Sequence, residues 1–333
     1  MNRCSKCAFP LGTRPGIYEE NGVCGACINL ERAKTFDWAK REQDLKAICD
    51  ELKSRKQEYD CVVAVSAGKD STVIVANLVE KYGMNPLLVT VRDEFTGTQA
   101  GKHNMENLAK RFDLDHIVWR CKPETFKKET LNDFNNDGHL LKWIEEKIYK
   151  VPVMIAKKFG IRAVFFGENS AFQYGVSKNL EHKHSISDDD TDVYFFFSFY
   201  PYSELGNREN AKKYGFKDLE DFNEWYRQGH IERYTQQDSI GYVTHLWLKY
   251  LKFGFQRVSD IACRYVRAGI LTREQALQHI KDHDWQLDKQ SKEDVCRFIG
   301  IKEKEFDSVC DKIANRDILA KDSNGNWKLK EFL

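Results

Sequence analysis

Four cysteines near the start of the chain are spaced like the ligands of a metal ion. Cys4 and Cys7 form one Cys-x-x-Cys pair, and Cys24 and Cys27 form a second pair after sixteen intervening residues. Thiolates separated by two residues can approach one ion from a single turn, and this spacing is typical of a tetrahedral zinc ribbon. Because four thiolates leave no open position for water or substrate, we expect a structural Zn²⁺ rather than a catalytic one.

A second group of residues has the types and the placement of a phosphate-binding loop. Residues 66–72 read Ser-Ala-Gly-Lys-Asp-Ser-Thr and lie between a short apolar run and a helical pattern. The first turn of a helix offers unpaired N–H groups and a positive dipole end, and small residues let those groups close around a pyrophosphate. Ser66 and Ser71 add hydroxyl donors, and Lys69 adds a mobile cation. The alternative is an ordinary turn with Asp70 or Ser71 as the helix N-cap.

The elements around this loop predict an α/β fold with a parallel, doubly wound sheet. Continuous apolar runs of the kind buried in parallel sheets alternate with amphipathic helical patterns. The runs span residues 61–66, 86–91, 116–121 and 162–167, and the helical patterns span residues 71–82, 101–112, 123–136 and 139–159. Ligands of such sheets bind at the carboxyl ends of the strands, so the loop lies where chemistry is expected.

The division of the chain follows from composition and periodicity. We predict a zinc ribbon over residues 1–30, a linker helix over 31–58, an ATP-binding domain over 59–205 and an α-helical C-terminal region over 206–333. Lys+Arg of 52 against Asp+Glu of 51 gives a net charge of +1, which argues against a general nucleic-acid binder. No signal peptide or membrane span is predicted, so we expect a cytoplasmic protein.

The loop resembles the PP-loop signature Ser-Gly-Gly-x-Asp-Ser of ATP pyrophosphatases, with Ala67 in place of the first glycine. Over nearly its full length the chain resembles the N-acetyl sugar amidotransferase family, the WbpG and PseA type. Besides the cysteine pairs, the segments that carry this resemblance are residues 13–17, 22–27, 82–91, 104–107, 151–153, 167–169, 174–175, 240–242 and 252–254, with Arg257.

This resemblance implies an ATP-dependent ligase of bacterial surface glycan or flagellin sugar biosynthesis. Such an enzyme adenylates the acetamido oxygen of a nucleotide-activated sugar, releases pyrophosphate, and lets ammonia displace AMP to give an acetamidino group. The implied cofactors are ATP, Mg²⁺ and structural Zn²⁺. A separate HisH-like glutaminase is implied as the ammonia source, because no glutaminase signature is evident in this chain.

The resemblance also implies roles for single residues. The catalytic set is Lys69, Asp70, Glu168 and Asn169. The nucleotide set is Ser66, Ala67, Gly68, Lys69, Asp70, Ser71, Thr72, Thr90, Val91 and Gly167. The acceptor set is Tyr174, His245, Lys252 and Arg257, and the metal set is Cys4, Cys7, Cys24 and Cys27.

Two other functions stay open at this point. A tRNA thiolation enzyme also joins a cysteine ribbon to a PP-loop, and Cys121 and Cys263 could serve it, although no third Cys-x-x-Cys pair occurs. A non-catalytic adaptor could use the ribbon to dock a partner and merely retain the nucleotide-binding core. Turnover of ATP to AMP would exclude the adaptor.

Overall fold

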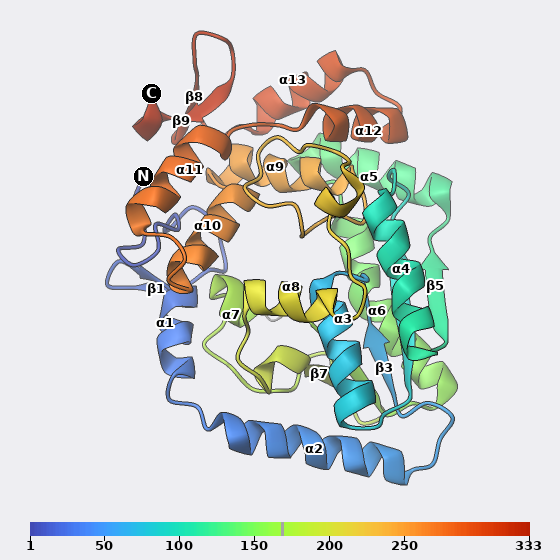
Figure 1. The fold of residues 1–333 in the computed structure, drawn as a ribbon. Helices are drawn as coiled ribbons and strands as arrows, with labels where there is room; N and C mark the ends of the chain where they lie inside the picture. The colour runs from blue at the N-terminus through green and yellow to red at the C-terminus, as the bar shows by residue number, and fades with distance from the viewer. Residues whose placement is uncertain (168–169) are drawn as a thin grey trace.

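A five-stranded parallel sheet forms the centre of the molecule in the computed structural model, which describes residues 1–167 and 170–333 (Figure 1). Its strands are β3 (Cys61–Ala64), β4 (Pro86–Arg92), β5 (His116–Arg120), β6 (Ala163–Phe166) and β7 (Asp192–Phe195). They lie in the order β5-β4-β3-β6-β7, and every pairing is parallel. The predicted parallel α/β sheet is therefore confirmed.

Alternate residues of the central strands point to two hydrophobic layers. Val63 and Phe165 face the layer that contains α3 (Lys69–Ala76), and Val62 and Val164 face the layer that contains α6 (Lys142–Phe159). Burial on both faces explains why these strands read as continuous apolar runs rather than as alternating ones. The other helices around the sheet are α2 (Trp38–Ser54), α4 (Gln99–Phe112), α5 (Pro123–Asp137), α7 (Ser170–Tyr174) and α8 (Glu204–Lys212), with a π-helical turn at Asn77–Lys81.

The strand order places a ligand crevice directly above the phosphate loop. The chain runs outward from β3 through β4 to β5, then returns to the other side of β3 to form β6. The carboxyl ends of β3 and β6 are therefore the point at which the connections diverge, and open α/β sheets bind ligands at this point. Residues 65–68 leave β3 there and lead into α3.

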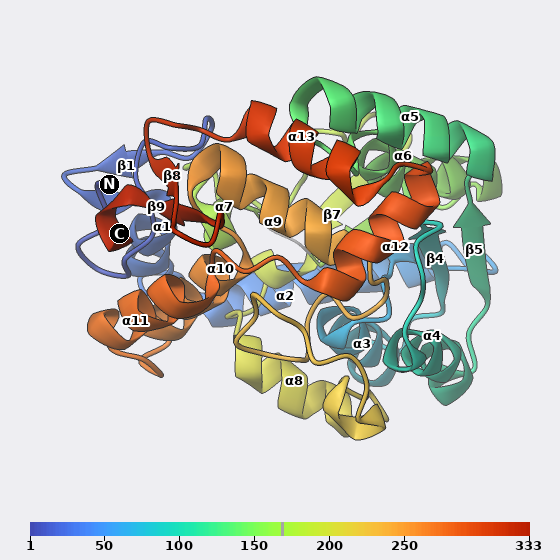
Figure 2. The same cartoon turned by 90° about the horizontal axis from the view of Figure 1, so that it is seen from above.

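The C-terminal region is mostly helical, as predicted. It contains α9 (Tyr242–Phe253), α10 (Arg257–Arg267), α11 (Arg273–His283), α12 (Lys289–Ile299) and α13 (Glu303–Ile313), with short helical turns at Glu220–Phe222 and Lys330–Phe332. Figure 2 shows α12 and α13 beside α5, where Phe134 stacks on Phe306 in a shared core. The structure has a hairpin of β8 (Leu319–Lys321) and β9 (Trp327–Leu329).

The four cysteines lie in a small module that packs on the rest of the chain. The module holds β1 (Glu19–Glu20), β2 (Val23–Cys24) and α1 (Gly25–Ala33), and it lies beside α10 and α11 in Figure 1. Gly25 and Gly175 touch through their backbones, since a Cβ atom on Gly175 would lie 2.5 Å from the Cα of Gly25. This contact joins the module to the end of α7.

The predicted element boundaries agree with the structure to within a few residues, except at β7. None of the four predicted strands covers residues 192–195, which form an edge strand of the sheet. The domain divisions at residues 30, 58 and 205 stay predictions. Within the described ranges, no helix is long and apolar enough to cross a bilayer.

Candidate active site

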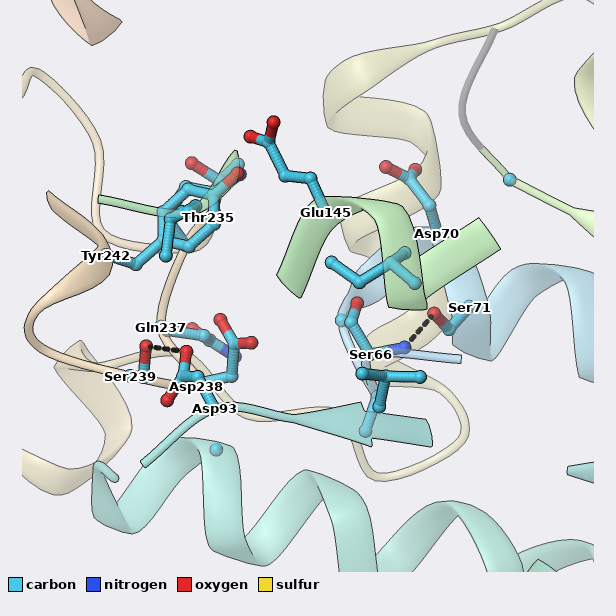
Figure 3. Close-up of a pocket in the computed structure, with 18 of the residues that line it drawn as sticks. Ser66, Asp70, Ser71, Asp93, Glu145, Thr235, Gln237, Asp238, Ser239 and Tyr242 are labelled. Atoms are coloured by element: carbon cyan, nitrogen blue, oxygen red, sulfur yellow. Dashed lines mark hydrogen bonds between the residues drawn. The ribbon is translucent and has the colours of Figure 1, made fainter. Parts of the chain in front are cut away.

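The phosphate loop presents an uncapped helix N-terminus to a large cavity. Gly68 is the N-cap of α3 and no side chain caps this helix end. The backbone N–H of Ser66 donates to Oγ of Ser71 across 3.1 Å, which closes the loop on itself (Figure 3). Ala67 has a φ of +57°, a left-handed conformation that glycine adopts more readily. The local geometry is that of a loop able to bind an anion with backbone N–H groups.

Lys69 is fixed rather than mobile, which differs from the sequence interpretation. Its ammonium nitrogen lies 2.7 Å from Oδ2 of Asp70 and 2.9 Å from Oε1 of Glu204, and its side chain is only 5% exposed. Burial opposes the charge, but the anionic neighbours raise the pKa of Lys69 well above its ordinary value. The lysine therefore stays charged and is positioned before any ligand arrives.

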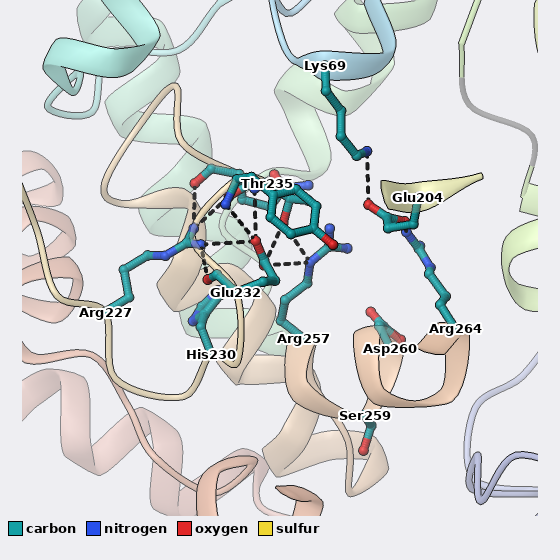
Figure 4. A network of polar contacts seen from close by, with 12 residues as sticks. Lys69, Glu204, Arg227, His230, Glu232, Thr235, Arg257, Ser259, Asp260 and Arg264 are labelled. Atoms are coloured by element: carbon teal, nitrogen blue, oxygen red, sulfur yellow. Dashed lines mark hydrogen bonds and ion pairs between the residues drawn. The ribbon is translucent and has the colours of Figure 1, made fainter. Parts of the chain in front are cut away.

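Glu204 connects this lysine to the C-terminal region (Figure 4). Its second carboxylate oxygen accepts from Nη1 of Arg264 across 2.9 Å and from the hydroxyl of Tyr202 across 3.0 Å. Burial disfavours the charged carboxylate, yet Lys69 and Arg264 hold the pKa of Glu204 well below its usual range. The buried carboxylate of Glu204, on α8, thus connects Lys69 to Arg264 on α10.

Asp70 faces the same network from the first turn of α3. Its Oδ1 accepts from Nδ2 of Asn207 across 2.7 Å, while Oδ2 is the partner of Lys69. The one hydroxyl proton of Tyr202 is shared between Oδ2 of Asp70, across 3.3 Å, and Glu204. Lys69, Asn207 and Tyr202 therefore orient this carboxylate, and it lines the cavity.

The cavity has a volume of about 680 Å³ and extends well beyond the loop. This is within the usual range for ligand pockets, which is about 300–1,000 Å³. Of the predicted residues, those from Ser66 to Ser71 line it, as do Thr90, Val91 and Gly167. So do Tyr174, His245, Lys252 and Arg257, whereas Thr72 is buried behind the loop. Glu168 and Asn169 lie outside the described residues.

The end of β4 forms another wall. Thr90 donates through its hydroxyl to the backbone oxygen of Val65 across 2.7 Å, which ties this strand to the start of the phosphate loop. Asp93 follows the strand and accepts from Oγ of Ser239 across 2.7 Å (Figure 3). Burial raises the pKa of Asp93 to about 7, and Asp238 adds to this rise. A carboxyl with this pKa can exchange a proton near neutral pH.

His139, Glu145 and His245 form a cluster that lines the same cavity. Nε2 of His139 and Nε2 of His245 lie 3.7 Å and 3.6 Å from the carboxylate oxygens of Glu145. The three could hold a metal ion by residue type and proximity. However, the N–H of Leu141 points at Nδ1 of His139 across 3.3 Å, which leaves the ring proton on Nε2. That tautomer favours a hydrogen-bonded cluster over metal ligation.

The cysteine module has the geometry of a closed metal site. Sγ of Cys4 lies 3.9 Å from Sγ of Cys27, and Sγ of Cys7 lies 3.6 Å from Sγ of Cys24. Tetrahedral Zn–S bonds of about 2.3 Å place sulfurs about 3.8 Å apart, so the four thiols fit this ion. All four cysteines are buried. The predicted four-cysteine cluster is confirmed, and its composition suits zinc.

The C-terminal region is similar to a known protein family. Residues 228–333 match the family described as "LPS biosynthesis protein WbpG-like, C-terminal domain". We call this segment, residues 228–333, the WbpG-like domain. This match confirms the resemblance to WbpG-type proteins drawn from the sequence. The WbpG-like domain also contributes a large share of the cavity wall, including Tyr234, Gln237, His245, Lys252, Arg257 and Arg264.

Other known proteins are similar over more of the chain. An uncharacterized protein of Methanocaldococcus jannaschii, MJ1599, is 24% identical over 288 residues, which cover 84% of this chain and 93% of that protein. The NMN synthetase of Francisella tularensis has a TM-score of 0.37 at 12% identity and covers 80% and 94% of the two chains. The NH3-dependent NAD synthetase of Campylobacter jejuni has a TM-score of 0.34 at 15% identity and covers 55% and 79%.

Several residues of the site were not found by sequence reasoning. Glu204 and Tyr202 contact Lys69, and Arg264 contacts Glu204, only through tertiary packing, so no local pattern identifies them. Lys249 could have been found, because it lies four residues after His245 and three before Lys252 on one helix face. Arg14, in a segment that carried the family resemblance, also lines the cavity.

Proposed function

We propose that this protein is an ATP-dependent amidotransferase that converts the acetamido group of a nucleotide-activated bacterial sugar into an acetamidino group. The observation that carries the proposal is one cavity lined by both the phosphate loop and the WbpG-like domain. The loop supplies donors suited to a pyrophosphate leaving group, and the family description, LPS biosynthesis, supports a sugar acceptor.

The proposed reaction has two displacements. The acetamido oxygen attacks the α-phosphorus of ATP, the bond to the β-phosphate oxygen breaks, and pyrophosphate leaves. The lone pair of ammonia then attacks the carbon of the adenylated imidate. The carbon–oxygen bond breaks, AMP leaves with the former amide oxygen, and nitrogen loses a proton. Adenylation is needed because the oxygen of an amide is a poor leaving group.

The residues described next act in the first displacement, in which pyrophosphate leaves ATP. The N–H groups at the start of α3 hold the pyrophosphate, and the fixed ammonium of Lys69 offsets the negative charge that develops there. Asp70 and Asp93 bring carboxylate oxygens to the ends of β3 and β4, and such oxygens suit Mg²⁺. Mg²⁺ bound there would neutralise charge on the phosphates of ATP. The predicted roles of Glu168 and Asn169 remain part of this proposal.

The test is AMP and pyrophosphate release from ATP with ammonium, screened over UDP- and CMP-linked acetamido sugars and bulk tRNA. Mass spectrometry of the acceptor should show exchange of oxygen for NH on one sugar. Lys69→Ala should lower AMP formation about a hundred- to a thousandfold. Lys81→Ala, which removes an exposed lysine just after the same helix, should leave it unchanged. AMP release with tRNA alone, or full activity of Lys69→Ala, would contradict the proposal.

The cysteine positions do not favour tRNA thiolation. Cys263 packs with the cysteine module, and Cys121 lies in the core shared by α5 and the C-terminal helices. Within residues 1–167 and 170–333, no cysteine lines the cavity. A sulfur carrier on the chain would need a thiol there.

Two components of the system are also proposed. The four cysteines hold a structural Zn²⁺, so Cys24→Ser should lower zinc content and melting temperature together. A stable protein without metal would contradict this.

A separate glutaminase of the HisH-like type delivers ammonia, so the isolated chain should turn over with ammonium and not with glutamine. Glutamine-dependent turnover by the chain alone would remove the need for this partner.

A further inference from the structure

The cysteine module reaches into the cavity through Arg14. This arginine lies in the loop between the two cysteine pairs, and its guanidinium is 5.7 Å from the centre of the Tyr174 ring. The module is held in place next to that tyrosine. The N–H of Tyr18 donates to the backbone oxygen of Gly175 across 3.1 Å, and Nδ2 of Asn29 donates to that of Ala171 across 2.8 Å.

One face of α9 brings two further cations, Lys249 and Lys252, to the same end of the cavity. His245, Lys249 and Lys252 follow one another at helical spacing and all line the cavity. The ammonium of Lys252 donates to the backbone oxygens of Asp137 and Gly138, across 3.1 Å and 3.4 Å. Burial lowers the pKa of Lys252, Asp137 opposes this, and Arg14 contributes to it through its positive charge. The cations are therefore close enough to repel one another.

The acidic groups at this end do not balance these charges. Asp260 lies 3.5 Å from Lys249, and Glu145 faces the two histidines. Among the residues that the structure describes, neither Arg14 nor Lys252 has a carboxylate within ion-pair distance. Two half-buried cations that lack a carboxylate partner are typical of an anion site.

We propose that Arg14 and Lys252, with Lys249 beside them, bind the two phosphate groups of a nucleoside diphosphate sugar, so that the cysteine module supplies part of the acceptor site. The two negative charges of the diphosphate match the two unbalanced cations. This inference rests on the proposed function, because it identifies the acceptor of that reaction by its charge. It gives the module a role in substrate binding besides its metal.

The experiment is equilibrium binding of UDP to the full-length, zinc-loaded protein, with the ATP site filled by α,β-methylene-ATP. Arg14→Gln should raise the Kd for UDP about tenfold or more, because a phosphate contact with a charged donor is lost. Arg14→Lys should recover part of the affinity. Lys6→Gln removes an exposed lysine of the same module and should leave the Kd unchanged. Lys252→Gln should weaken UDP binding as Arg14→Gln does.

The outcomes separate this inference from the proposed function. If Arg14→Gln and Lys252→Gln keep full zinc content and bind UDP like the unmodified protein, the diphosphate site is wrong, whatever the enzyme makes. If UDP binding depends on Arg14 but no sugar supports AMP release, the site stands and the proposed function fails. A KM effect of Arg14→Gln for the sugar, with the KM for ATP unchanged, would support both.

Discussion

Two buried glutamates organise the C-terminal side of the cavity, and they do so in opposite ways. Glu232 finds nearly all its partners within five residues, from Arg227 to the backbone N–H groups of Tyr234 and Thr235. Glu204 finds partners on α3 and α10, which lie far apart in the sequence. Each carboxylate is almost fully buried beside two cations.

The difference separates a local support from a long-range connection. Glu232 shapes the loop of residues 227–235, whose end lines the cavity, and it keeps Arg257 charged and in place. Glu204 orients Lys69 of the phosphate loop. Because it also pairs with Arg264, it connects that lysine to the WbpG-like domain. Changes at Glu232 should therefore act mainly on stability, and changes at Glu204 mainly on the chemistry of the phosphate loop.

The largest expected effect is on stability, from Glu232→Gln. This change leaves Arg227 and Arg257 buried with no carboxylate between them, and breaking a buried pair in this way costs about 3–5 kcal/mol. The measurement is the free energy of unfolding in denaturant. A loss below about 1 kcal/mol would show that Glu232 is not the support that its contacts indicate.

Glu204→Gln should have a smaller effect on stability and a larger one on AMP formation. In this variant Lys69 still donates a hydrogen bond to Asp70, and Arg264 still donates one to the hydroxyl of Tyr174. Both buried cations therefore retain a polar partner. We expect AMP formation to fall about ten- to a hundredfold, because Lys69 loses its orientation. A double-mutant cycle with Lys69→Ala should show coupling of about 1–3 kcal/mol. Additive effects of the two changes would show that Glu204 does not act through Lys69, which would contradict its contrast with Glu232.

The pH dependence of stability should differ between the protein and its Glu232→Gln variant. Burial opposes the charge of Glu232, but Arg227 and Arg257 lower its pKa to about 2. The unfolded carboxyl has a pKa of about 4.3, so the unfolded chain takes up the proton first as pH falls. The contribution of Glu232 is present above about pH 4.3 and is lost toward pH 2. The variant should lack this part of the acid transition in a pH series of unfolding curves.

The smallest expected effect is at Ala67. Its left-handed backbone costs a residue with a side chain about 1 kcal/mol relative to glycine, so Ala67→Gly should raise the free energy of unfolding by about that amount. Ala76→Gly in α3 is the matched control and should lower it. A destabilising Ala67→Gly would mean that the packing of the Ala67 methyl outweighs the backbone strain.

The sequence could predict those parts of the molecule that local patterns determine. Apolar runs predicted four of the five strands. The strand β7 was missed because residues 192–195 continue directly into further aromatic residues, so the sequence shows no strand boundary there. The cysteine spacing and the phosphate loop are local and were found. Glu204, Arg264 and Tyr202 depend on how α8 and α10 pack against α3, and single-sequence periodicity does not contain that packing.

The central claim is that the chain transfers AMP from ATP to an amide oxygen. An acetamido sugar labelled with heavy oxygen in its amide group tests it most directly, with ammonium and ATP supplied and AMP analysed by mass spectrometry. The account predicts that the label leaves the sugar and appears in the phosphate of AMP. Label that stays on the sugar, or AMP that carries none of it, would contradict adenylation at this oxygen.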